Sequence, residues 1–427
     1  MIQMTAPVDA WRNRLLGVAL FTLPAASLAF KSGYSWGALL LCVIGALTWR
    51  NPYPPLNTRH IWKGWGMAIT SIGLLWLLSA IFDTPFRLNS LDRPSKFALA
   101  LLALPAAWQI RPHHTRPLIW GMLTGVFAAA ALAAWQVNLE GMSRAWGNTN
   151  AIHFGNLALL LGLWSWIWTR HDTPAWSTAG WAALVAGLYT SIASEARGGW
   201  LMAPVLLALA IWLTQQRPQP SLRRTARWGQ TAATVVLVGG ILSWQWPIVT
   251  DRLMLAWQET QLHAQNGTTN TSVGQRLAHW KLAWEMGSEK PLTGWGETGY
   301  QSEKQARASR GEIPALLANF GHAHNEWLEM WAKHGALGLL ALGLLLGVPG
   351  WIYAASWRRA RTASIPHADL CQRASVCGLV LVIGYFGFGM TQVMLAHNSG
   401  VMMYLFMNSV FLGLISTSWV SSSAQTD

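Results

Sequence analysis

Apolar runs about as long as a bilayer is thick recur along this chain, and they constrain its fold more than any other feature. Ranges such as 64–82 and 400–419 approach the roughly 20 residues that a helix needs to cross a membrane. Only 11% of the residues are charged, whereas a soluble protein has roughly 25%. Because a backbone in lipid must satisfy its own hydrogen bonds, such runs form helices. The sequence therefore predicts an all-α polytopic membrane protein.

The apolar runs divide the chain into about 12 transmembrane helices. The expected spans cover residues 15–30, 33–49, 64–82, 96–110, 117–139, 151–168, 176–193, 198–214, 229–247, 332–355, 374–395 and 400–419. The first span also resembles a signal peptide, with Arg12 and Arg14 before an apolar stretch and a cleavage-like site at Ser27-Leu28-Ala29. We expect it to be retained, because its removal would change the parity of the spans.

The basic residues set the orientation of these spans. Most of them fall in alternate loops, which is the pattern of cytoplasmic loops; they are Arg12, Arg14, Arg50, Arg59, Lys63, Arg111, Arg116, Arg170, Arg217, Arg223, Arg224, Arg227, Arg358, Arg359, Arg361 and Arg373. Both termini are then cytoplasmic. The net charge of +13 is explained by these orientation signals, so no nucleic-acid partner is expected.

The one long external segment, residues 248–323, lies between the ninth and tenth spans. The sequence thus predicts three parts: spans 1–9 over residues 1–247, a helical loop region over 248–323, and spans 10–12 with a short tail over 324–427. Within the loop region, Ser272-Val273-Gly274-Gln275 is a capping-box pattern that predicts a helix from about Val273. The following PLTGWGETGY, with Gly294, Gly296 and Gly299, predicts a tight loop with exposed backbone.

Two arginines on the external side are candidates for binding an anion. In SEARGGW, residues 194–200, Arg197 at the junction of two spans could grip phosphate, and Gly198 would let a headgroup approach the backbone. A salt bridge with Glu195 explains Arg197 equally well. Arg276 lies beside a helix N-terminus, which attracts anions. From spacing alone, however, a solvated arginine on a surface helix is the favoured interpretation of Arg276.

A histidine at the start of the tenth span is the candidate general base. Asn325 is a good N-cap, which places His324 beside a helix N-terminus, where the neutral imidazole is favoured. His322 and His334 invite a zinc site, but histidines at these spacings match no common ligand pattern. The dipeptide His397-Asn398 is interpreted as a cap for the last helix. No metal and no cofactor are expected.

These motifs together resemble a known family. HNEWLEMWAKHGALG, residues 324–338, is similar to the pattern of the bacterial O-antigen ligases, in which His and Asn are followed after nine residues by Gly, two residues and Gly. SEARGGW and the segment from Gln275-Arg276 through PLTGWGETGY look like the arginine-bearing loops of the wider ligase and polymerase superfamily. The resemblance covers about residues 190–340, and the order of the motifs makes it fairly specific.

The resemblance implies a membrane-embedded glycosyltransferase of the GT-C-like kind. Such an enzyme takes a finished polysaccharide from undecaprenyl diphosphate and transfers it to a sugar hydroxyl of the lipid A core at the periplasmic face of the bacterial inner membrane. His324 is then the base that activates the acceptor, and Arg197 and Arg276 clamp the diphosphate. Asn325, Gly198, Gly294 and Gly296 are expected to line the donor or glycan site. Membrane lipids surround the enzyme.

Three alternatives stay open at this point. An O-antigen polymerase uses the same donor with a growing glycan as acceptor, and a protein O-oligosaccharyltransferase uses a protein hydroxyl. A secondary transporter also fits twelve spans. No two-fold repeat and no string of ionisable residues at mid-membrane is apparent, and both features are usual in transporters.

Overall fold

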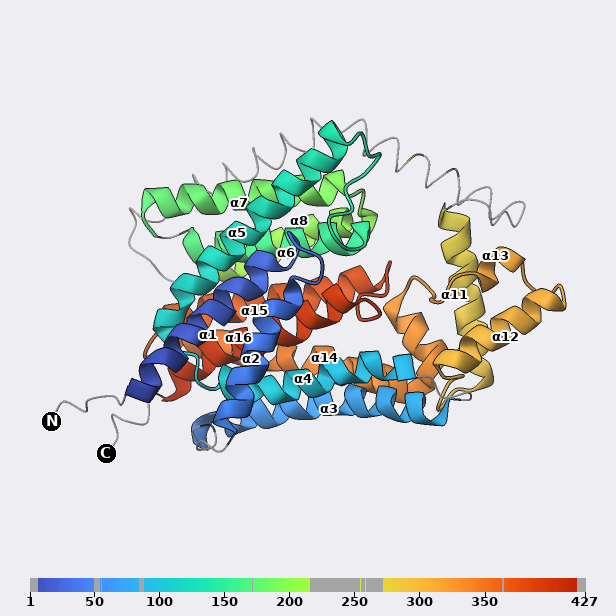
Figure 1. Cartoon of the computed structure of the whole chain (residues 1–427), viewed down its shortest axis with the longest axis horizontal. Coiled ribbons are helices and arrows are strands. Elements are labelled where there is room, and N and C mark those ends of the chain that lie inside the picture. The colour runs from blue at the N-terminus through green and yellow to red at the C-terminus, as the bar shows by residue number, and fades with distance from the viewer. Residues whose placement is uncertain are drawn as a thin grey trace. The chain divides into compact units, whose positions relative to one another are not determined.

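The computed structural model describes residues 7–49, 54, 56–83, 88–170, 172–215, 254, 258, 272–362 and 365–420 (Figure 1). All regular elements in these residues are helical. The chain forms two compact units. The first comprises residues up to Phe82, Phe86–Thr214 and the chain from Leu340 onward, and the second comprises Asp83–Pro85 and Gln215–Leu339. The second boundary falls inside one long helix, α14 (Glu326–Thr362).

The first unit is a bundle of long apolar helices. It contains α1 (Pro7–Ala26), α2 (Tyr34–Thr48), α3 (Arg59–Phe82), α4 (Asp92–Ala107), α5 (Thr115–Ala134), α6 (Ala151–Thr169), α7 (Pro174–Ala193), α8 (Arg197–Gln215), α15 (Ala368–Gly389) and α16 (Asn398–Val420), together with the second part of α14. A π-helical turn, Trp135–Leu139, extends α5. Among the described helices, seven are long and apolar enough to cross a membrane. The protein is therefore a polytopic all-α membrane protein, as the hydropathy pattern predicts.

The helices α6 and α16 form the centre of this bundle. Almost every residue of α6 and every residue of the apolar stretch of α16 is buried, whereas fewer than half of the residues are buried in the apolar stretches of α3 and α8. Two buried hydrogen bonds join helices of the bundle: the Trp65 indole N–H donates to Ser409 Oγ at 3.0 Å, and the Tyr353 hydroxyl donates to Asn408 Oδ1 at 2.9 Å. Such pairing is needed because an unpaired polar group in an apolar interior is costly.

The helix positions agree with most of the expected spans, but one prediction is wrong in register. The span expected at 374–395 is the helix Ala368–Gly389, so residues 390–397 form a connection before α16 instead of continuing the helix. The first helix also begins earlier than predicted, at Pro7. The expected ninth span, 229–247, lies outside the described residues, and the count of twelve stays a prediction.

The second unit is a small helical assembly. It contains α11 (Ser272–Glu289), α12 (Glu297–Ser309), α13 (Ala315–Ala318) and the start of α14. The predicted helix start near Val273 is confirmed by α11. The core of this unit brings together apolar side chains of α11, α12, α14 and the loop before α14, namely Leu282, Ala283, Met286, Tyr300, Ala323 and Ala332.

A break inside α14 joins this helix to the glycine-rich loop. Gly335 has φ 58° and ψ −149°, a conformation that is essentially restricted to glycine. The break leaves backbone groups unpaired within the helix, and residues 291–296 satisfy them. Trp295 N–H donates to Ala332 O at 3.0 Å, and Ala336 N–H donates to Pro291 O at 2.8 Å. Gly335 is thus required by the close approach of the two segments.

Candidate functional site

Three aromatic rings from two segments of the second unit meet at the candidate base. His324 contacts the ring of Phe320, with centroids 5.7 Å apart, and the ring of His279 in α11, at 5.8 Å. His279 and Phe320 are 5.4 Å apart, so the three rings form a nearly equilateral triangle. The ring of His322 packs edge-on against His324 at 4.3 Å. The structure therefore gathers three histidines at the position where the sequence predicts one base.

The start of α14 fixes the backbone on either side of His324. Asn325 is the N-cap, because its side-chain oxygen accepts hydrogen bonds from the N–H groups of Trp327 at 3.0 Å and Leu328 at 3.1 Å. His324 has φ 54°, in the left-handed region that residues other than glycine rarely adopt. Strained backbone of this kind persists only where the surroundings hold it, and it is frequent at active sites.

Three buried side chains hold the loop that carries the histidines. Lys304 of α12 donates to the carbonyl of Phe320, and Lys333 of α14 donates to the carbonyl of Gly321 at 3.1 Å. Glu329 accepts the N–H of Ala323 at 2.7 Å. We call Lys304, Glu329 and Lys333 the loop clamp. Each member is at most 3% exposed.

The loop clamp contains two lysines and one glutamate, and Glu297 supplies a second carboxylate beside it. Lys333 forms ion pairs with Glu329 and, at 2.7 Å, with Glu297. The aromatic ring of Tyr300 lies within 5.0 Å of the Lys304 ammonium and 5.5 Å of the Lys333 ammonium. Burial lowers the pKa of Lys304 to about 8, although Glu329 opposes this shift. Burial and the nearby carboxylates raise the pKa of the Tyr300 hydroxyl.

Arg276 lies on the helix that contributes His279. It is the fifth residue of α11, and it precedes His279 by three positions. Residues three apart are neighbours on one face of a helix. Arg276 is partly buried. One arginine of the predicted phosphate clamp and one histidine of the cluster therefore share α11, although the predicted role of Arg276 stays a prediction.

Arg197 belongs to the first unit, and it begins α8 at the predicted junction of two spans. The glycines beside it are closely packed. A Cβ on Gly198 would lie 2.2 Å from Thr391 Oγ1, and one on Gly199 would lie 2.6 Å from Asn156 Oδ1. The structure thus gives both glycines a packing reason that sequence alone could not supply. A contact between Gly198 and substrate stays a prediction.

The glycine-rich loop has a backbone role that the sequence does not reveal. Gly294 and Gly296 have φ of 65° and 73°. Their N–H groups donate to the carbonyls of Lys290 at 2.9 Å and Lys333 at 2.8 Å, so these donors are already used within the protein. Gly299, predicted in the loop, lies instead in the first turn of α12. Contact of Gly294 or Gly296 with substrate stays a prediction, and the observed role is to bind the break in α14.

The remaining predicted histidines lie elsewhere. His334 is buried in α14, where its Cβ packs against Gly338. His397 precedes α16, and its carbonyl accepts the N–H of Val401 at 3.0 Å, as expected of a residue at a helix start. Over the residues that the structure describes, no group of three or more His, Cys, Asp or Glu side chains is arranged to hold a metal ion.

Sequence reasoning missed His279 and the loop clamp. His279 could have been found from its spacing to Arg276 on an expected helix. Lys304, Glu329 and Lys333 carry no comparable local signal, because they come from two helices and converge only through tertiary packing.

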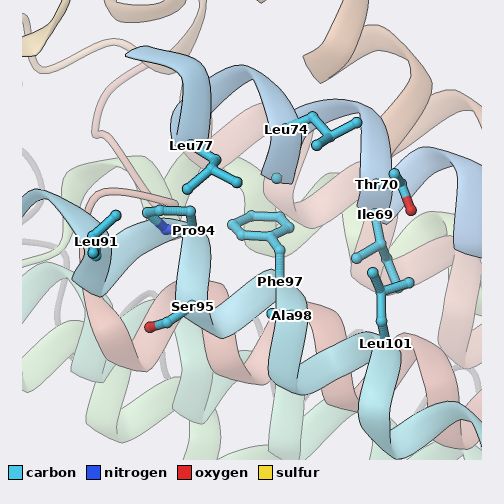
Figure 2. Close-up of a pocket in the computed structure, with 11 residues that line it drawn as sticks. Ile69, Thr70, Leu74, Leu77, Leu91, Pro94, Ser95, Phe97, Ala98 and Leu101 are labelled. Carbon is cyan, nitrogen blue, oxygen red and sulfur yellow. The ribbon is translucent and has the colours of Figure 1, made fainter. Parts of the chain in front are cut away.

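An apolar groove in the first unit is lined by no side chain that could act as a general acid or base. The helices α3 and α4 pack side by side and leave a cavity of ≈280 Å³ (Figure 2). Leu74 and Leu77 from α3 and Pro94 and Phe97 from α4 line it, and no titratable side chain does. The groove can take hydrocarbon but cannot catalyse a transfer.

Comparisons with known proteins match the part of the chain that carries the candidate site. Residues 182–343 match a family described as O-antigen ligase. This stretch includes Arg197, Arg276, His279 and His324. An uncharacterised protein of Haemophilus influenzae is 25% identical over 391 residues, which cover 91% of this chain and 94% of that protein.

Proposed function

We propose that the chain is a lipid-diphosphate-dependent O-antigen ligase, because its residues 182–343 match the O-antigen ligase family, a family of glycosyltransferase-type enzymes of ligase or polymerase type. Its donor is a glycan carried on undecaprenyl diphosphate, and its acceptor is a sugar hydroxyl of the lipid A core. The observation that carries this proposal is the position of His324, which is held in a strained conformation at a helix start, beside His279 on the helix that bears Arg276.

In the proposed reaction, His324 accepts the proton of the acceptor hydroxyl. The hydroxyl oxygen attacks the anomeric carbon of the donor, and the bond from that carbon to the diphosphate oxygen breaks. Undecaprenyl diphosphate leaves with the electron pair, and Arg197 and Arg276 neutralise its charge through paired hydrogen bonds. Attack opposite the leaving group inverts the anomeric centre. Asn325 supports the base by fixing the start of α14.

The same assignment places the enzyme in the bacterial inner membrane. The basic loops put both termini in the cytoplasm, so the second unit, with His324, faces the periplasm. Both substrates are anchored in that leaflet, which explains why a base belongs where the chain enters the membrane. If the two arginines stabilise the diphosphate, neither the deprotonation of the acceptor nor the departure of the diphosphate needs a metal ion.

The experiment that tests this function uses the full chain in lipid nanodiscs. The protein is incubated with undecaprenyl-diphosphate glycan and rough lipopolysaccharide, with and without a chelator. We expect a ladder of larger lipopolysaccharide products at the same rate in both samples. Extension of the donor glycan without transfer to lipopolysaccharide would assign polymerase activity instead. Loss of transfer in chelator that magnesium restores would overturn the metal-independent mechanism.

A further inference from the structure

His279 is a buried histidine whose ring nitrogens make no hydrogen bond to the described residues. Its side chain is 1% exposed, and neither ring nitrogen has a hydrogen-bond partner among the described residues. Its contacts are edge-on packing against the rings of Phe320 and His324. A buried donor or acceptor without a partner carries its full desolvation penalty, and native proteins retain few such groups. An apolar side chain would fill the same space without this penalty.

The protonation state of His279 defines what the ring can bind. Burial lowers the pKa of His279 to about 3, with smaller contributions from Lys304 and His324. The ring is therefore neutral at physiological pH, with one nitrogen that donates and one that accepts. A hydroxyl group can satisfy either nitrogen, because it both donates and accepts. A diphosphate oxygen only accepts, so it is a poorer match.

The position of His279 places such a hydroxyl beside the base. The ring centroids of His279 and His324 are 5.8 Å apart, so one sugar residue at this site would contact both rings. Phe320 is partly exposed, and its ring packs against both histidines. We propose that His279 hydrogen-bonds a hydroxyl group of the acceptor sugar and holds that sugar against His324.

This inference rests on the function proposed above. It assigns donor binding and acceptor binding to two different residues of one helix. Arg276 and His279 lie three residues apart in α11. The guanidinium suits the donor diphosphate, whereas the neutral imidazole suits the acceptor. Loss of His279 should therefore weaken acceptor binding and leave donor binding intact.

The test compares His279→Leu and His279→Gln in the full chain in nanodiscs. Binding of rough lipopolysaccharide is measured without donor, and transfer kinetics are measured with both substrates. For His279→Leu we expect the Kd and the KM of the acceptor to rise about 10-fold, which corresponds to the loss of one hydrogen bond. The donor KM should be unchanged. His279→Gln keeps a donor and an acceptor, so it should recover most of the acceptor affinity.

Thermal unfolding separates this role from a structural one. His279→Leu should unfold at the wild-type temperature or above, because it removes two buried unpaired groups. The inference is overturned if the wild type transfers glycan and His279→Leu binds rough lipopolysaccharide as tightly. It is also overturned if the variant loses stability and binds donor and acceptor equally poorly. A wild type that neither binds lipopolysaccharide nor transfers glycan to it contradicts the proposed function itself.

Discussion

Glu329, in the first turn of α14, accepts the backbone N–H of Ala323, the residue immediately before His324, at 2.7 Å. The same carboxylate pairs with Lys333. One buried side chain therefore connects the helix that enters the membrane bundle to the loop that carries the candidate base. The conformation of His324 depends on this connection, since no regular element includes the loop.

We predict that Glu329→Gln loosens this loop. Glutamine can still accept the N–H of Ala323, but it removes one carboxylate partner of Lys333 and leaves the ion pair with Glu297. Breaking a buried ion pair commonly costs about 3 to 5 kcal/mol, and the remaining pair should keep the cost near the lower value. Hydrogen exchange at residues 320–325 should accelerate, and glycan transfer should fall.

The matched control for this change is Glu312→Gln. Glu312 pairs with Arg310 at the exposed end of the second unit, where both side chains are 49% exposed. Exposed pairs contribute little to stability, so this variant should resemble the wild type. Wild-type exchange and transfer in Glu329→Gln would show that the clamp does not hold the loop.

A second prediction concerns the break in α14. Gly335→Ala should destabilise the protein by about 3 kcal/mol, because the backbone conformation is essentially restricted to glycine. The added Cβ would also lie 2.5 Å from the carbonyl carbon of Leu292. Thermal unfolding and transfer rate provide the measurement. Gly343→Ala, in open space in the same helix, is the control and should not destabilise the protein, because alanine favours a helix interior over glycine by about 0.5 to 1 kcal/mol. Equal stability of the two variants would contradict the prediction.

The sequence predicts the spans well because hydropathy reports contact with lipid. The prediction fails where the ends of an apolar run do not coincide with the ends of a helix. The helix α15 begins at Ala368, in a polar turn with Asp369 and Arg373, outside the apolar run. At the other end, Val393 and Leu395 are apolar because they are buried in protein, although they lie in a connection. Apolarity alone cannot separate these two environments.

The site shows the same division between local and tertiary information. The start of α11 and the N-cap Asn325 are predictable, because capping depends on residues within one turn. The glycines are recognisable in the sequence, but their structural role is not. Gly335 breaks α14, and the N–H of Gly296 donates to Lys333 O just before this break, which no local pattern reveals. His279 reaches His324 only once α11 packs against the loop.

A third prediction concerns the two arginines. If Arg197 and Arg276 clamp diphosphate through paired hydrogen bonds, lysine should substitute poorly, because a point charge cannot reproduce the planar fork. Arg197→Lys and Arg276→Lys should each lower kcat/KM by at least about 10-fold, which corresponds to one charge-assisted hydrogen bond. Arg310→Lys, remote in an exposed ion pair, is the control. Near-normal transfer by both variants would leave only a general electrostatic role.

The pH dependence of stability gives a fourth prediction. The pKa of His279 is lowered in the folded protein to about 3 from its ordinary value of 6.5. The unfolded chain therefore binds a proton between these values when the folded chain does not. The folded protein therefore loses stability as the pH falls below 6.5, by at most about 1.4 kcal/mol per pH unit, because the buried ring of His279 resists protonation. His279→Leu should flatten this part of the unfolding profile. An unchanged acid dependence would contradict the lowered pKa.

The last prediction tests His324 as the base. His324→Ala should lower the transfer rate by roughly 10² to 10⁴-fold, because general base catalysis is lost. Binding of undecaprenyl-diphosphate glycan should persist, since His324 acts on the acceptor and not on the diphosphate. His322→Ala and His334→Ala are the controls, and both should retain far more activity. His322 is the stricter control, because its ring centroid lies 4.3 Å from that of His324 and it could therefore serve as the base itself. Equal inactivation of a well-folded His322→Ala, or wild-type transfer by His324→Ala, would move the base to another residue.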